Sequence, residues 1–233
     1  MLLTGPKSDL LIAKLTDEKT DNESFPWLSH KSIKLCGEDT RVLKVSYAGE
    51  KGFEIHVHND SMKKIYDELV QHGENFNLIH FGMLALDSMR LEKNYRSWKS
   101  DLTSDYTMLQ SGLEKWIKFD KGNFIGKEAL KNEFDLGTSK KFVTLVVDDP
   151  EDNKPFGEPV YLSPVFAGDD YLGPIVSSGY GHRVKKSISM AILDDRNLNG
   201  LNDQLYIDVL GRKRKAYIVN EALYDPENLK LRS

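Results

Sequence analysis

Ionisable and apolar side chains alternate in the segment 53–58. This alternation predicts a β-strand that carries Glu54, His56 and His58 on one face. Histidine is a common metal ligand, but neither these two nor His80 and His182 form a recognisable metal-ligand spacing with a cysteine or carboxylate. The pattern alone therefore predicts a solvent-facing polar surface in which Glu54 is one polar residue, and no metal site.

A second group of charged residues lies on a predicted helix in the middle of the chain. Asp87 and Arg90 are separated by three positions, and Glu92 follows them. Residues with this spacing meet on one helix face, so Asp87 and Arg90 can form an ion pair. We predict a structural pair that holds the helix to the following loop, rather than a catalytic pair.

A glycine phrase late in the chain raises the question of a dinucleotide site. It reads Gly179-Tyr180-Gly181-His182, with Val184 where a third glycine would stand. A dinucleotide fingerprint needs all three glycines at a turn from a strand into a helix, whereas these lie among strand-like runs. We predict no FAD or NAD site in this chain.

The elements that position Glu54 are a predicted hairpin and a helix. The first strand of the hairpin is expected to place Leu43, Val45 and Tyr47 on one face, and residues 48–52 form the loop to the second strand. A helix follows, capped by Asn59 or Asp60 and ended by Gly73. The residues expected on its apolar face are Met62, Ile65, Tyr66, Leu69 and Val70.

Earlier in the chain, the sequence predicts a helix that starts at Pro6 and carries Leu11 and Leu15 at helical spacing. A strand over 33–35 should turn at residues 37–39.

Beyond residue 138 the helical periodicity stops and turn residues separate short strand-like runs at fairly even spacing. These runs span 141–147, 158–162, 171–178, 187–193, 204–210 and 215–220. We predict an α+β fold: an antiparallel sheet with packed helices in domain 1–137, followed by a small C-terminal β-barrel in domain 138–233.

The composition of the chain bears on its binding partners and its location in the cell. The 233 residues are 29% charged and 39% hydrophobic, with a net charge of −4, so we expect no nucleic-acid partner. The one basic run, 212–215, is predicted to be a solvated hairpin turn. The single Cys36 excludes an internal disulfide, and no apolar run is long enough for a membrane helix. We expect a cytoplasmic protein, or one of the mitochondrial matrix if the source is eukaryotic.

Several motifs, in order along the chain, resemble the folate-binding aminomethyltransferase family, which includes the glycine cleavage T-protein. The resemblance covers nearly the whole chain and is closest to the C-terminal folate-binding region of sarcosine and dimethylglycine dehydrogenases. The motifs are Gly5-Pro6-Lys7-Ser8, the phrase from Asp87 to Trp98, Gly112-Leu113 with Trp116, and Asp120-Lys121-Gly122 with the phrase from Phe124 to Leu130. In the family the Gly-Pro-Lys-Ser phrase lies inside the catalytic domain, so the chain is expected to lack an N-terminal part that carries a catalytic aspartate. No catalytic residue is assigned here.

The resemblance implies tetrahydrofolate as cofactor and three contact residues. The family phrase Tyr-x-Gly-Glu-x-Gly-Phe-Glu matches Tyr47 to Glu54, which makes Glu54 the carboxylate that accepts two neighbouring N–H donors of the pterin. Tyr47 would line the pocket, and the indole of Trp116 would pack against the ring system. Where several T-proteins carry an arginine for the glutamate tail of the folate, this chain has Leu86.

The implied function is one-carbon transfer to tetrahydrofolate, with 5,10-methylenetetrahydrofolate as product. The donor would be sarcosine or dimethylglycine, or else the glycine-derived aminomethyl group of lipoyl H-protein, and the implied partner is a flavoprotein subunit or H-protein. One alternative is a folate-dependent accessory protein of the iron–sulfur and tRNA-modification type. Asn123 and Lys127 replace the cysteine and glutamine of that family's motif and count against it. The other alternative is a non-catalytic structural subunit.

Overall fold

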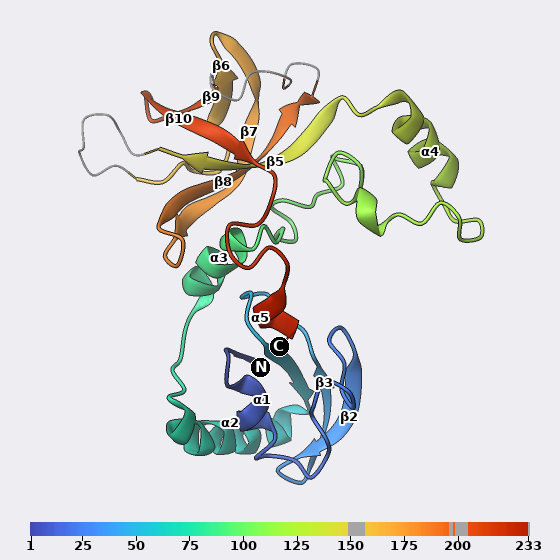
Figure 1. Cartoon of the computed structure of the whole chain (residues 1–233), viewed down its shortest axis with the longest axis vertical. Helices are drawn as coiled ribbons and strands as arrows, with labels where there is room; N and C mark the ends of the chain where they lie inside the picture. Colours follow the sequence, from blue (N-terminus) through green and yellow to red (C-terminus); the bar gives the residue numbers. More distant parts are fainter. Residues whose placement is uncertain (149–156, 196–197, 199–204, 233) are drawn as a thin grey trace. The chain divides into compact units, whose positions relative to one another are not determined.

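The computed structural model describes residues 1–148, 157–195, 198 and 205–232 (Figure 1). Two compact units make up the chain: Met1–Lys93 with Leu223–Ser233, and Asn94–Ala222. The C-terminal residues thus return to the first unit after the chain has built the second. The predicted domain boundary near residue 138 follows a change in sequence character, and it stays a prediction.

An antiparallel four-stranded sheet forms the centre of the first unit, in the order β1-β4-β3-β2. Its core lies on one face, where Phe53 and Ile55 of the sheet pack with Leu11, Ile65 and other apolar residues. The elements of this unit are β1 (Leu2–Thr4), α1 (Ser8–Ile12), β2 (His30–Leu35), β3 (Glu38–Leu43), β4 (Gly52–Val57), α2 (Asn59–Gly73), the 3₁₀ turn η1 (Glu74–Phe76), α3 (Met83–Glu92) and α5 (Leu229–Arg232).

A two-residue turn at Cys36 and Gly37 joins β2 to β3. The turn was predicted at residues 37–39, but Glu38 and Asp39 already belong to β3. Cys36 and Gly37 have φ angles of 53° and 82°. Positive φ at both central residues defines the type I′ turn, whose twist matches that of the flanking strands.

The first strand predicted for the next hairpin was wrong, because Val45 and Tyr47 lie in the loop after the strand that forms. The strand β3 ends at Leu43, and its Val42, not Leu43, pairs with Ile55 of β4 and is buried in the core. Since side chains alternate across a sheet, Leu43 lies on the opposite face, beside Glu54. The next residue, Lys44, is buried, which no alternating apolar pattern could anticipate.

Helix α2 has the predicted extent and ends at Gly73, but its cap differs. The N-cap is His58, whose Nδ1 accepts the backbone N–H of Asp60 at 3.5 Å, rather than Asn59 or Asp60. Of the predicted apolar face, Ile65 and Leu69 are buried, while Met62 and Tyr66 are exposed.

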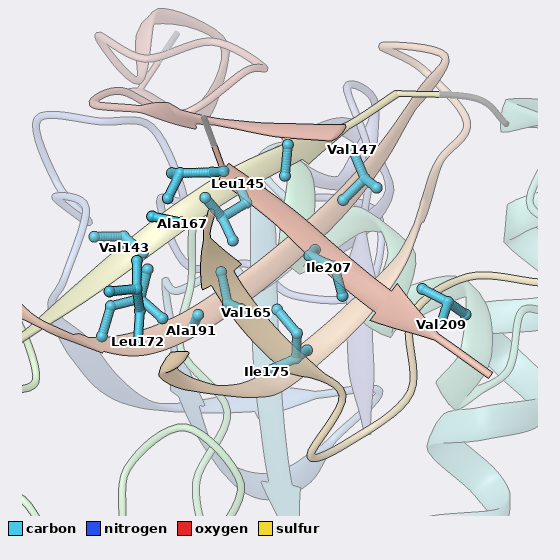
Figure 2. Close-up of a cluster of buried hydrophobic side chains, with 13 residues drawn as sticks. Val143, Leu145, Val147, Val165, Ala167, Leu172, Ile175, Ala191, Ile207 and Val209 are labelled. Atoms are coloured by element: carbon cyan, nitrogen blue, oxygen red, sulfur yellow. The ribbon is translucent and has the colours of Figure 1, made fainter. Parts of the chain in front are cut away.

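The second unit contains a closed barrel in the strand order β10-β5-β8-β7-β6-β9, which confirms the predicted architecture. Figure 2 shows its interior, filled by small and branched apolar side chains such as Val143, Val165, Ala191 and Ile207. The elements of this unit are the 3₁₀ turn η2 (Glu114–Trp116), α4 (Lys127–Leu136), β5 (Lys140–Val147), β6 (Pro164–Ala167), β7 (Asp170–Gly181), β8 (Lys186–Asp194), β9 (Leu205–Val209) and β10 (Arg212–Val219).

Two predictions in the barrel region were wrong. Residues 158–162 form no strand, because Leu162 has a φ of 68° and the strand β6 begins only at Pro164. The basic run lies in strand β10, after a Leu210-Gly211 turn, and it is not itself the turn. Its Arg214 is buried and donates to the carbonyl oxygens of Asp148 and Gly157 at 2.9 and 3.2 Å. The first residue of the predicted run 204–210 lies outside the described residues.

The loop that follows α3 packs against the outside of the barrel within the second unit. Asn94 accepts a hydrogen bond from Thr144 at 2.7 Å, and the Arg96 guanidinium lies 4.2 Å from the Phe142 ring centroid. The buried Asp101 carboxylate accepts hydrogen bonds from the Ser97 backbone and the Ser177 hydroxyl. None of the helices in the described ranges is long and apolar enough to cross a membrane.

Candidate functional site

Glu54 lies on the sheet face opposite the core, at a rigid position. The strand β4 is central in the sheet, so Glu54 is flanked by Leu2 of β1 and Leu43 of β3. Its side chain is 46% exposed and lies 3.3 Å from the Nε2 atom of His56. A carboxylate fixed by two neighbouring strands and still open to a ligand suits recognition of paired N–H donors.

The connection that carries Tyr47 runs over residues 44–51, and we call it the hairpin loop. Tyr47 is half-buried within it. Both ends of the loop contact Thr4, the last residue of β1, or the adjacent Gly5. Ser46 lies 3.4 Å from the Thr4 hydroxyl, and the Lys51 carbonyl accepts from Thr4 and from the Gly5 backbone at 3.0 and 2.9 Å. These contacts fix the loop where it enters and leaves the sheet.

A broad depression of about 1270 Å³ covers the outer part of the sheet in this unit. Its lining includes Arg41, Leu43 and His56, together with residues 14–18, but neither Glu54 nor Tyr47. The Glu54 carboxylate therefore does not line this depression, but it lies 3.3 Å from His56, which does.

Trp116 belongs to the other unit. It ends the 3₁₀ turn η2, is 61% exposed, and has the Lys115 ammonium 5.3 Å from its ring centroid. Tyr47 and Glu54 belong to the first unit and Trp116 to the second. All three roles remain predictions.

The pair on α3 has the predicted geometry. The Arg90 Nε donates to the Asp87 carboxylate at 2.7 Å, with Arg90 buried and Asp87 half-exposed. The prediction that His56 and His58 share a strand face was wrong, because β4 ends at Val57 and His58 is the N-cap of α2. In the described part of the chain no three His, Cys, Asp or Glu side chains are grouped as metal ligands.

Sequence reasoning missed the buried ion pair behind the hairpin loop. Lys93 follows α3 directly, and its Nζ donates to the Asp225 carbonyl at 2.5 Å and to the Asn228 side chain at 2.8 Å. The Asp225 carboxylate lies 3.7 Å from the same ammonium, and the two side chains are 1% and 6% exposed. The partners are 132 positions apart, so no local pattern indicated the contact.

Comparison with known proteins gives concordant matches. Residues 1–121 match the model of the GCVT N-terminal domain, and residues 140–225 match that of the glycine cleavage T-protein C-terminal barrel domain. An aminomethyltransferase from Thermoanaerobacter sp. (strain X514) is 30% identical over 225 residues, which are 96% of this chain and 59% of that protein. The human mitochondrial dimethylglycine dehydrogenase is 29% identical over 226 residues, 95% of this chain and 25% of that protein.

The fold has a solved counterpart in the glycine cleavage system aminomethyltransferase T from Bartonella henselae. The TM-score is 0.80 at 19% identity, over 97% of this chain and 59% of that one. The chain thus spans about three fifths of these aminomethyltransferases and a quarter of the dehydrogenase. With both family models matched in order, the chain belongs to the family of the glycine cleavage T-protein and is aminomethyltransferase-like.

Proposed function

We propose that this chain binds tetrahydrofolate through Glu54 and Tyr47 and takes part in one-carbon transfer. The observation that carries the proposal is the Glu54 carboxylate, held on a central strand and half-exposed on the sheet face away from the core. A reduced pterin presents two neighbouring N–H donors, and a carboxylate can accept both. The two oxygens of the Glu54 carboxylate thus match the two N–H donors of the pterin.

Bound tetrahydrofolate would supply the two nitrogens that take up a one-carbon unit at the formaldehyde level, giving 5,10-methylenetetrahydrofolate. The protein's own share is to orient the pterin through Glu54 and to limit its movement through Tyr47, since positioning lowers the entropic part of the barrier. No residue of this chain is assigned as proton donor or acceptor.

For the one-carbon donor we propose sarcosine or dimethylglycine first. The support is the match to the mitochondrial dimethylglycine dehydrogenase and to the mouse sarcosine dehydrogenase, 26% identical over 237 residues. The glycine-derived aminomethyl group of lipoyl H-protein is the second proposal, supported by the aminomethyltransferase relatives. The corresponding partners would be a flavoprotein subunit or H-protein.

Glu54→Gln tests the proposal directly. Glutamine keeps the shape but replaces one acceptor oxygen by a donor. The binding free energy for tetrahydrofolate should weaken by more than about 1 kcal/mol, so the Kd should rise more than about fivefold. Calorimetric titration measures it. The matched control is Glu68→Gln, since Glu68 also lies beside a histidine, His72, at 3.5 Å with similar exposure. An unchanged Kd in a folded Glu54→Gln variant would remove Glu54 from the site.

Trp116→Ala is an independent test of the indole contact. Loss of a stacking surface should raise the Kd for tetrahydrofolate by about threefold to tenfold. Because Trp116 is largely exposed, the melting temperature should hardly change. Trp98→Ala, which removes another exposed indole of the same unit, serves as the control. Equal effects of the two variants on Kd would argue against a specific role for Trp116.

A further inference from the structure

We infer that the C-terminal segment, residues 223–232, is a positioning element for the hairpin loop, with Tyr224 as its principal contact. The inference rests on the proposed function and extends it to a segment that lies outside the family motifs described above. The segment folds onto the first unit, where it contacts the tip of the hairpin loop and the end of α3. The contacts of Ser46 and Lys51 with Thr4 and Gly5 hold the two ends of the loop, and the C-terminal segment contacts its tip, Gly49 and Glu50, directly or through Lys93.

The first contact is made by the Tyr224 side chain. Its hydroxyl donates to the Glu50 carboxylate, three positions after Tyr47. Two further hydrogen bonds hold Tyr224 in place. The Tyr224 backbone N–H donates to the Glu92 carbonyl at 3.0 Å, and the Lys230 ammonium donates to the Tyr224 hydroxyl at 3.0 Å. A phenol held at both ends can in turn hold Glu50.

The second contact supports the backbone of the loop at Gly49. The φ of Gly49 is +79°, and a Cβ placed there would lie 2.5 Å from the Lys93 Cγ, so the backbone rests directly on the lysine stem. Asp225 and Asn228 fix the ammonium at the other end of that stem. Through Lys93, the C-terminal segment also supports the loop from behind.

These contacts should matter for binding because they reduce the freedom of the loop before the ligand arrives. A loop that must be ordered on binding lowers the affinity, whereas a loop already held in its bound shape does not. Tyr47 lies two positions before Gly49 and three before Glu50. Holding these two residues therefore fixes where the Tyr47 side chain stands relative to the strand that carries Glu54.

The test combines ligand binding with loop protection. Tyr224→Phe should raise the Kd for tetrahydrofolate about fivefold and increase hydrogen exchange in the backbone of residues 46–51. Glu50→Ala should have the same effect, and the double variant should bind no worse than either single variant, because both remove one interaction. The matched control is Ser61→Ala, which also removes a hydroxyl donor to a glutamate, Glu38, in the same unit. It should change neither quantity.

The outcomes separate this inference from the proposed function. If the unaltered chain binds tetrahydrofolate and Tyr224→Phe binds equally well, or if the two substitutions add in full, the positioning role is wrong while the folate site stands. If the unaltered chain does not bind, the proposed function fails. Hydrogen exchange then still tests whether the C-terminal segment holds the loop. Equal exchange of residues 46–51 in Tyr224→Phe and Ser61→Ala would show that it does not.

Discussion

Gly173→Ala should lower the free energy of unfolding of the barrel by about 3 kcal/mol or more. Gly173 lies in β7 with a φ of +154°, a conformation that side chains rarely adopt. A Cβ at this position would lie 2.2 Å from the Ile192 carbonyl oxygen and 3.2 Å from the Leu193 Cα. These are backbone atoms of β8, which pairs along its length with β5, so they cannot move aside without disturbing that pairing.

Chemical denaturation of the two proteins measures the loss. Gly168→Ala separates the steric clash from the cost of positive φ, since Gly168 has a φ of +60° but no atom within 4 Å of its added Cβ. That control should lose only about 1 kcal/mol. An equal loss in both variants would show that β8 does not constrain position 173.

Lys93→Met should lower the free energy of unfolding by about 3–5 kcal/mol, the usual effect of breaking a buried ion pair. Methionine keeps most of the apolar stem beside Gly49 but removes the ammonium. The Asp225 carboxylate, 6% exposed, then loses its 3.7 Å cationic partner, and the Asn228 side chain loses a donor. A charge left unpaired in a buried place is what makes this loss large.

Two further variants isolate the electrostatic part of that loss. Lys64→Met removes a surface ion pair with Glu38, with side chains 52% and 29% exposed, and should lower the free energy of unfolding far less than Lys93→Met. Adding Asp225→Asn to Lys93→Met should recover part of the lost stability. The side chain at position 225 can still accept the backbone N–H groups of Leu229 and Lys230, but it no longer carries a buried charge without a counter-charge. Denaturation curves in which Lys93→Met and Lys64→Met coincide would contradict the account of this pair.

Local sequence pattern predicted the elements whose burial follows a simple period. Helix α2 was found with its C-terminal Gly73, and β5, β7 and β8 lie where alternating or continuous apolar runs indicated. The pattern failed where polar residues are buried. Arg214 sits in a strand because two carbonyl groups accept its N–H donors, and Lys44 is buried beside Asn22, which accepts from its ammonium at 2.7 Å.

The candidate site also has a part that the sequence predicted and a part that it did not. The sequence from Tyr47 to Glu54 predicted a loop followed by the strand that carries Glu54. The structure shows both, but the loop is longer and includes Tyr47, which was predicted in a strand. The residues behind the loop were not predicted. Glu50 and Tyr224 are 174 positions apart, and contacts over such distances depend on tertiary packing rather than on any spacing in the sequence.

The most direct test of the central claim is calorimetric titration of the purified chain with tetrahydrofolate or its 5-formyl analogue. The account predicts saturable binding with a Kd on the order of micromolar, and weaker binding by Glu54→Gln. A chain that melts cooperatively but gives no saturable heat with either ligand would contradict the claim that this sheet face binds a folate.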